Sequence, residues 1–222
     1  MQRKSFSSSA RRKFFKRLFD IFFSLAMLIC LSPLYLLLAV LVKCSSEGPI
    51  FYTSRRIGLG GKIIHCIKFR TMEKDADVKL PKLLASNPQL AAEWALFDKL
   101  HQDPRITPIG RFLRKTSLDE LPQFFNVLTG DLSVVGPRAL HVYGPIESHV
   151  QQMRRIYGEK TDQILSVRPG ITGIWQISGR SFIPIEERCQ LDALYVQQQT
   201  FWRDMLVICK TIPAVLHSKG AF

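Results

Sequence analysis

Two neighbouring carboxylates, Asp119 and Glu120, stand at the predicted start of a helix, directly after a basic stretch that contains Arg114. Paired carboxylates can hold a divalent cation such as Mg2+, and arginines hold phosphate oxygens through forked hydrogen bonds. A carboxylate can also attack phosphorus and form an acyl-phosphate, and a metal ion or a helix N-terminus keeps it ionised by lowering its pKa. This combination predicts chemistry on a phosphate ester.

The same segment also fits a purely structural interpretation. Ser117 followed three residues later by Glu120 is the pattern of a helix capping box. A cap requires only Glu120 and leaves Asp119 without a role. Pro122 falls in the first two turns and constrains how the helix begins. Capping alone and phosphate chemistry therefore stand as alternatives for this segment.

Further arginines lie beside glycine or proline in predicted turns, namely Arg138, Arg168 and Arg180. A turn can direct backbone N–H groups and a guanidinium at one anion. Each arginine taken singly is more often a solvated surface charge, but together with the paired acids they favour phosphate binding. The five histidines show no metal-ligand spacing, and the five cysteines are scattered and indicate reduced thiols.

An uncharged run of 22 residues, 21–42, carries Ser32-Pro33 at its centre. A straight helix of this length spans about 33 Å, enough to cross a bilayer core of roughly 30 Å. Pro33 kinks or breaks a helix, and the Ser32 hydroxyl can hydrogen-bond where the backbone ladder is interrupted. The run therefore predicts either a kinked single span or a re-entrant helix–break–helix hairpin.

The charges on both sides of this run favour the re-entrant hairpin. Residues 1–17 contain seven Lys and Arg and no acid, and residues 43–222 carry a net charge of +7. Basic flanks favour the cytoplasmic side, and only a hairpin keeps both flanks there. Long domains can cross a membrane regardless of charge, so the single span stays open. A cleaved signal peptide fits poorly, because no small-x-small site follows the run.

The remaining chain is long enough for one compact domain and short for two. We expect an α+β fold that is mostly helical. Glycines within 58–61, between strand-like stretches at 49–53 and 62–67, predict a β-hairpin. The chain thus divides into a disordered basic arm, a re-entrant membrane helix and a catalytic domain, at residues 1–17, 18–43 and 44–222.

Helices are predicted from capping signals and apolar spacing. Asn87-Pro88 predicts an N-cap and a first-turn proline before a helix over 89–100. Two more helices are predicted around 109–113 and after Ser117, followed by short extended pieces. The stretch Phe201–Cys209 predicts an amphipathic helix, whose aromatic residues suit a membrane interface or a protein core.

A formal charge of +13 and a pI near 9.8 indicate anionic partners such as lipid headgroups, phosphates or nucleic acid. One alternative is therefore a membrane-tethered module that binds anionic lipid or nucleic acid without catalysis. Acids placed among arginines weaken binding to a phosphate backbone, so Asp119 and Glu120 argue against it. A second alternative is a membrane-bound phosphatase or nucleotidyl transferase that uses the same acids and metal.

The motifs resemble those of the bacterial sugar transferase family, the monotopic phosphoglycosyl transferases that start glycan assembly on a polyprenyl phosphate. The matching segments are Arg114–Gln123, Gly136-Pro137-Arg138 and Arg168–Gly173, and the resemblance runs from about Lys16 to the C-terminus. The chain is most similar to short members that initiate exopolysaccharide synthesis. It departs at Ala139, where the family usually has a second proline, and we expect only a local backbone change.

The resemblance implies a two-step mechanism. Asp119 would attack a UDP-hexose and release UMP, and undecaprenyl phosphate would then accept the hexose-1-phosphate. Mg2+ would be held by Asp119 and Glu120. The residues that match phosphate-binding positions of the family are Arg114, Arg138 and Arg180, with Arg168 as a further candidate.

The resemblance also implies where the protein works. The family has a re-entrant helix that breaks at a Ser-Pro, which matches Ser32 and Pro33. We therefore expect the bacterial inner membrane, with the catalytic domain on its cytoplasmic face, and no nucleic-acid partner. Trp175–Arg180 resembles the branch that transfers glucose- or galactose-1-phosphate. A homodimer is compatible with the sequence.

Overall fold

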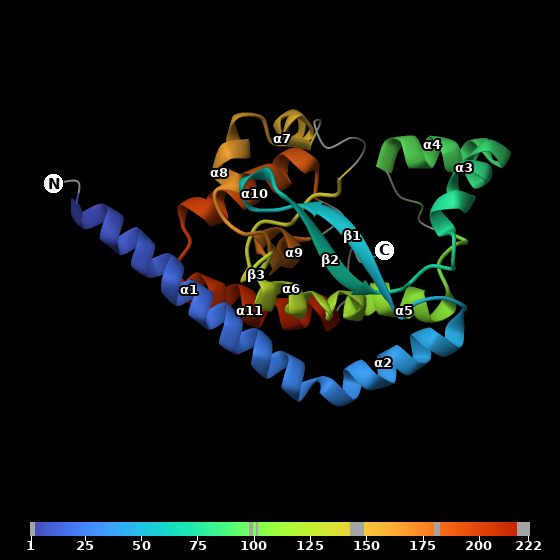
Figure 1. Ribbon diagram of the computed structural model, residues 1–222. Helices are drawn as coiled ribbons and strands as arrows, with labels where there is room; N and C mark the ends of the chain where they lie inside the picture. The colour runs from blue at the N-terminus through green and yellow to red at the C-terminus, as the bar shows by residue number, and fades with distance from the viewer. Residues whose placement is uncertain (1–2, 98–99, 101, 143–148, 180–182, 217–222) are drawn as a thin grey trace.

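The computed structural model describes residues 3–97, 100, 102–142, 149–179 and 183–216. The prediction of a mostly helical fold with a short β-hairpin is confirmed. Figure 1 shows two long N-terminal helices that form a V along one side of the molecule, with the rest of the chain packed inside it. Helices α3 (Ala76–Ser86) and α4 (Pro88–Phe97) lie apart from this body, near the far end of the V.

The V is built from α1 (Arg3–Cys30) and α2 (Ser32–Ser45), which are bent by 64° at Leu31. The break falls where Ser32-Pro33 predicted it, with the proline in the first turn of α2. The Ser32 hydroxyl donates to the Ile29 carbonyl over 2.8 Å, at the interrupted ladder. No single helix of the described residues is long and apolar enough to cross a membrane, but the bent pair meets that test together.

The prediction of a disordered arm over residues 1–17 is wrong, because α1 already begins at Arg3. Contacts with the body hold the later part of this stretch. Arg17 donates to the carbonyls of Val127 and Leu128, and Lys16 forms an ion pair with Asp204 over 3.0 Å. Lys16 and Arg17 thus dock the end of this stretch on the body, whereas Arg11, Arg12 and Lys13 are exposed.

The predicted hairpin is confirmed as β1 (Phe51–Ile57) and β2 (Ile63–Phe69), an antiparallel pair. Its turn contains Gly60 and Gly61, both at positive φ, which glycine adopts without strain. Cys66 is buried against the domain, and side chains two residues apart on a strand share a face. Lys68 therefore points into the domain from the same face of β2.

The helix start at Asn87 agrees with its predicted capping signal, and Thr107 caps a further helix that was predicted from apolar spacing alone. The Asn87 side chain accepts hydrogen bonds from the backbone of Gln89 and Leu90, at the start of α4. The Thr107 side chain accepts one from Gly110 at the start of α5 (Pro108–Thr116).

The capping-box interpretation at Ser117 is wrong. Ser117 has a left-handed backbone, with φ 56°, and its side chain makes no capping hydrogen bond. It ends α5 instead, because its backbone N–H donates to the Arg114 carbonyl over 3.1 Å. An N-cap residue needs an extended backbone instead. A short 3-10 helix η2 (Leu118–Glu120) follows, and α6 (Gln123–Thr129) begins only after Pro122. The acid pair therefore lies in a tight turn.

Beyond α6 the predicted extended pieces are only partly correct. Strands β3 (Ser133–Val135) and β4 (Gly170–Thr172) form a parallel pair, and the backbones of Gly136 and Gly170 approach so closely that a side chain on Gly170 would clash. The apolar run Ile171–Ile177 is extended only to Thr172 and is helical from Ile174, since a short apolar run does not distinguish a strand from a helix. Most of the described residues between 149 and 197 are helical. These helices are α7 (His149–Tyr157), α8 (Thr161–Leu165), α9 (Ile174–Ser178) and α10 (Ile185–Gln197). The predicted C-terminal helix is confirmed as α11 (Phe201–Leu216).

Helix α2, the second helix of the bent pair, shares a hydrophobic core with the rest of the chain. Leu38 and Val42 of α2 are buried together with Phe69 of β2 and Leu113 of α5. Leu118 and Leu121, which flank the acid pair, pack against this cluster. Helix α2 therefore supports the turn that carries the carboxylates.

Asn126 joins α6 to the free edge of the hairpin. Its side chain accepts from the Ile67 N–H over 2.8 Å and donates to the His65 carbonyl over 2.7 Å, as a neighbouring strand would. It also donates to Asp131 over 3.3 Å. One buried amide thus fixes β2, and with it Lys68, against α6.

We expect Asn126→Ala to lower the free energy of unfolding by about 2–4 kcal/mol, because it removes hydrogen bonds to two backbone groups and one carboxylate. Chemical or thermal unfolding in detergent measures the loss. The matched control is Asn87→Ala, which removes an exposed helix cap and should cost about 1 kcal/mol. Equal losses in the two variants would contradict the bracing role of Asn126.

Candidate active site

The structure brings the two carboxylates of η2 together with basic side chains from distant parts of the chain. Glu120 accepts a fork from Arg138, with one bond of 2.7 Å to Oε2 and a second to Oε1. Lys68 also donates to Glu120 Oε1 over 2.6 Å. Charge-assisted and forked hydrogen bonds of this kind are the strong ones in proteins. Glu120 is therefore held by two cations.

Asp119 lies beside this ion cluster and is only 6 % exposed. Its Oδ2 is 3.5 Å from the Lys68 ammonium, which thus bridges both carboxylates. Arg114 stands nearby and is fixed by a 2.9 Å hydrogen bond from its Nε to the Thr71 hydroxyl. The cluster defined here as the acid–base cluster consists of Lys68, Arg114, Asp119, Glu120 and Arg138.

The two carboxyl groups respond in opposite ways to this environment. Burial raises the pKa of Asp119 above its usual value, and although Lys68 lowers that pKa, the adjacent Glu120 charge raises it further. Burial also disfavours the Glu120 charge, but Arg138 and Lys68 outweigh burial and hold the pKa of Glu120 well below its usual range. Glu120 is thus a fixed anion, whereas Asp119 is the more basic and less strongly engaged of the two.

Each member of the acid–base cluster is placed by a different element. Lys68 extends from β2, and Arg114 from the last turn of α5, which the left-handed Ser117 ends. Helix α2 steadies the acidic turn, because the Tyr35 hydroxyl donates to the Leu121 carbonyl over 2.6 Å. The site is therefore assembled from the hairpin, the α5–α6 turn and the segment after β3.

Arg138 follows β3 and is fixed by its backbone as well as by its side chain. The Pro137 carbonyl before it accepts from Gly170 over 2.9 Å, and its own carbonyl accepts from Arg188 over 3.1 Å. Arg188 stacks over the Trp175 ring, 4.6 Å from its centre. The guanidinium therefore reaches Glu120 from a backbone held on both sides.

Comparison with known proteins identifies the family. The sequence profile of the family described as bacterial sugar transferase matches residues 11–218, nearly the whole chain. The chain belongs to the bacterial sugar transferase family. It is 44% identical over 207 residues to the exopolysaccharide production protein ExoY of Sinorhizobium fredii, a match that covers 93% of this chain and 88% of that relative.

Longer relatives carry names of phosphotransferases. The chain is 45% identical over 210 residues to the undecaprenyl-phosphate galactose phosphotransferase of Salmonella typhimurium, covering 95% of this chain and 42% of the relative. It is 39% identical over 217 residues to the UDP-glucose:undecaprenyl-phosphate glucose-1-phosphate transferase of Klebsiella pneumoniae, covering 94% and 41%. This chain therefore spans less than half of these two relatives. The protein is an enzyme of the phosphotransferase class.

The structure places only two of the four predicted phosphate-binding arginines of this sugar transferase in the acid–base cluster. Arg114 and Arg138 lie in the acid–base cluster, next to the predicted Asp119 and Glu120. Arg168 does not, because its Nε donates to the Gly130 carbonyl over 2.8 Å, at the opposite end of α6 from the acid pair. Arg180 lies outside the described residues.

Lys68 lies in a segment, Lys68–Met72, that also resembles the family's early hairpin, but the sequence assigned it no role in the site. The predicted second strand ended at Ile67, two residues before β2 ends at Phe69, so Lys68 was not placed on the inward face that strand alternation gives it. Thr71, which orients Arg114, lies three residues further on. A strand extended to Phe69 would have pointed to Lys68, whereas no local pattern marks Thr71.

We expect Lys68→Met to lower phosphotransferase activity by about 10-fold to 100-fold, because it removes a charge-assisted bond that bridges both carboxylates. The initial rate of the purified enzyme in detergent or nanodiscs measures the effect. Lys68→Arg retains the charge and should recover part of the activity. The control Lys62→Met changes an exposed lysine of the same hairpin and should leave the rate unchanged. A wild-type rate for Lys68→Met would exclude this role.

Proposed function

We propose that this protein transfers hexose-1-phosphate from a UDP-hexose to undecaprenyl phosphate, and so begins the synthesis of an exopolysaccharide or another surface glycan. The observation that carries the proposal is the acid–base cluster, in which Asp119 and Glu120 lie among Lys68, Arg114 and Arg138. The names of relatives that transfer galactose or glucose phosphate to undecaprenyl phosphate support the substrates.

In the first step, an Asp119 oxygen attacks the phosphorus that carries the hexose. A new oxygen–phosphorus bond forms, the bond to the second phosphate breaks, and UMP leaves with the bonding electron pair. Glu120 accepts the Arg138 fork and a 2.6 Å bond from Lys68, whereas Asp119 is only 3.5 Å from Lys68, so the Asp119 oxygens are the freer to attack phosphorus. The hexose-phosphate then remains on Asp119 as an acyl-phosphate.

In the second step, a phosphate oxygen of undecaprenyl phosphate attacks the same phosphorus. The acyl-phosphate bond breaks, the Asp119 carboxylate is restored, and the lipid carries a diphosphate-linked hexose. Both steps collect negative charge on phosphate oxygens, which guanidinium and ammonium groups stabilise. Arg114 and Lys68 flank Asp119 and are the groups placed for this task.

Asp119 and Glu120 also suit Mg2+, which takes oxygen ligands and is commonly held by one or two carboxylates together with substrate phosphates. Among the described residues no group of three or more acidic, histidine or cysteine side chains surrounds a common point. The two carboxylates would therefore hold the ion jointly with the UDP diphosphate. Bound there, the ion would neutralise charge on the leaving UMP.

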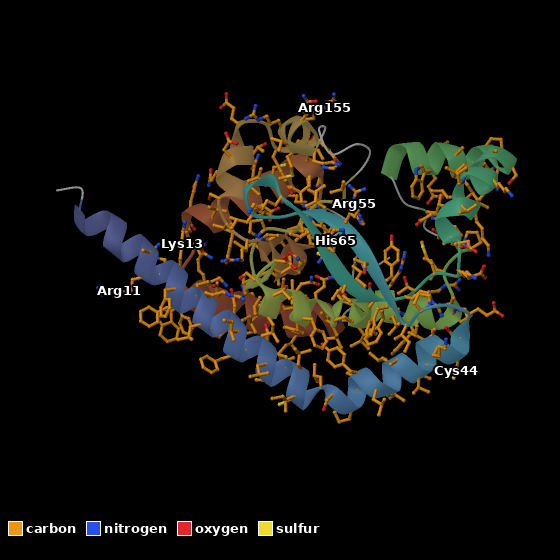
Figure 2. All side chains as sticks on the ribbon, viewed as in Figure 1. Arg11, Lys13, Cys44, Arg55, His65 and Arg155 are labelled. Carbon is orange, nitrogen blue, oxygen red and sulfur yellow. The ribbon has the colours of Figure 1, made fainter. Side chains whose placement is uncertain are left out.

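Helices α1 and α2 form a re-entrant hairpin in the inner leaflet under this proposal. Their exposed apolar side chains are Phe14, Phe15, Leu18, Phe22, Leu25, Ile29, Leu36, Leu37, Val40 and Leu41. Figure 2 shows Arg11 and Lys13 on the part of α1 that projects beyond the body, where basic groups meet anionic headgroups. The cytoplasmic face gives access to the UDP-hexose, while the lipid acceptor enters from the bilayer.

We expect Asp119→Asn to abolish UMP release from UDP-glucose or UDP-galactose, because the amide is not a nucleophile. A coupled assay measures UMP, and the mass of the wild-type protein mixed with UDP-hexose without acceptor should increase by one hexose-phosphate. The control Asp162→Asn changes an acid whose side chain is 82% exposed, and it should react at the wild-type rate. Normal turnover by Asp119→Asn would remove Asp119 as the nucleophile.

We expect the N-terminus and residues 44–222 to lie on the same, cytoplasmic side of the membrane, because both carry a positive net charge. Single-cysteine variants near the N-terminus and in the exposed part of α7 can be tested in intact cells with a thiol reagent that does not cross the membrane. Both sites should be protected until the cells are opened. Labelling of one site alone in intact cells would show a single span instead.

A further inference from the structure

Asp20 of α1 is a buried carboxylate to which the proposed reaction assigns no role. It is 2 % exposed, although it directly precedes the uncharged run. Its Oδ1 accepts from Lys16 over 3.1 Å and from the Val134 N–H over 3.1 Å, and its Oδ2 accepts from the Ser133 hydroxyl over 2.8 Å. A buried charge is tolerated only when it is paired and hydrogen-bonded.

The bond from Val134 shows what Asp20 does for β3. One edge of β3 pairs with the segment around β4. There the backbone N–H of Ser133 donates to the Pro169 carbonyl over 2.8 Å, and the N–H of Gly136 donates to the Thr172 carbonyl over 2.9 Å. The N–H of Val134 lies between these two and points to the other edge of the strand. Asp20 therefore takes the place of a neighbouring strand on the second edge of β3.

This strand leads directly to the acid–base cluster. Only Gly136 and Pro137 separate the end of β3 from Arg138, whose guanidinium forks on Glu120. A forked bond requires both partners to keep their positions and their orientations. The placement of β3 by Asp20 therefore bears on the Arg138 guanidinium.

Arg17, one turn before Asp20, contacts the helix that follows Glu120, the other partner of the Glu120–Arg138 ion pair. Its guanidinium donates to the carbonyls of Val127 over 2.5 Å and Leu128 over 2.9 Å, at the C-terminal end of α6. A cation at this end of a helix satisfies free carbonyls and complements the helix dipole. The acidic turn η2 lies just before α6, so α1 braces the elements that carry both Glu120 and Arg138.

We infer that Asp20 and Arg17 are positioning residues for the Glu120–Arg138 ion pair, so that the membrane-associated helix is part of the catalytic machinery as well as an anchor. The inference rests on the proposed function, in which this pair orders the site for phosphoryl transfer. Misplacement of catalytic groups by about 1 Å can cost on the order of 100-fold in rate.

The first test compares Asp20→Ala and Asp20→Asn with the control Ser24→Ala. Ser24 lies one turn further along α1, is fully buried, and its hydroxyl has no hydrogen-bond partner among the described residues. Asp20→Ala should lower kcat by about 10-fold to 100-fold, with a smaller change in the KM for UDP-hexose. Asp20→Asn still offers an oxygen to Val134 and should restore part of kcat, while Ser24→Ala should match the wild type.

A double-mutant cycle separates positioning from simple docking of the helix. If Asp20 acts through Arg138, Asp20→Ala should have much less effect on kcat in an Arg138→Lys background than in the wild type. Fully additive losses would overturn the inference. If the Asp20→Ala protein does not accumulate, Arg17→Gln, which leaves Asp20 intact, replaces it and is combined with Arg138→Lys in the same way.

Hydrogen exchange gives a readout that does not depend on activity. In nanodiscs, the backbone amides of residues 133–140 should exchange faster in Asp20→Ala than in the wild type, whereas Ser24→Ala should leave them unchanged. Unchanged exchange in Asp20→Ala would overturn the inference even if activity fell. A wild-type protein that releases no UMP would instead refute the proposed function, and the exchange result would still decide whether Asp20 holds β3.

Discussion

The structure depends on the pairing of one partly buried carboxylate, Glu120, with Arg138 and Lys68. A charge in this position is costly unless its partners arrive with the correct geometry, and removal of one partner leaves the others uncompensated. The three residues come from η2, the segment after β3, and β2, which are far apart in the sequence. The fold must therefore hold three separate elements at one point, and Asn126, Tyr35 and the close contact of Gly136 with Gly170 each serve this need.

The need to hold Glu120, Arg138 and Lys68 at one point also explains why helices α1 and α2 form one unit with the rest of the chain. Helix α2 contributes Leu38 and Val42 to a core with Phe69 and Leu113, while α1 reaches β3 and α6 through polar side chains. An anchor joined by a flexible linker would give neither kind of support. The bend at Leu31 lets one continuous pair of helices contact both halves of the site.

The sequence predicted those features that depend on local chemistry. The break at Ser32-Pro33, the glycine-rich hairpin turn and the acid pair beside Arg114 were recognisable from residue types alone. Features that depend on partners far away in the sequence were not recognisable from residue types. Ser117 resembled an N-cap, but its left-handed backbone ends α5. The apolar run that contains α9 was expected to be extended, because a short run does not distinguish a strand from a helix. The basic stretch before Asp20 gave no local sign that it docks on α6 and β3.

The parallel pairing of β3 with β4 has a consequence for the order of assembly. Strand β4 lies more than thirty residues after β3, so the loop between them must close before Gly170 can fix the segment that carries Arg138. During synthesis, α1, α2 and the acidic turn emerge from the ribosome well before Gly170 does. The acidic turn can therefore form before Gly170 has been made, whereas the segment that carries Arg138 is fixed only after Gly170 is in place.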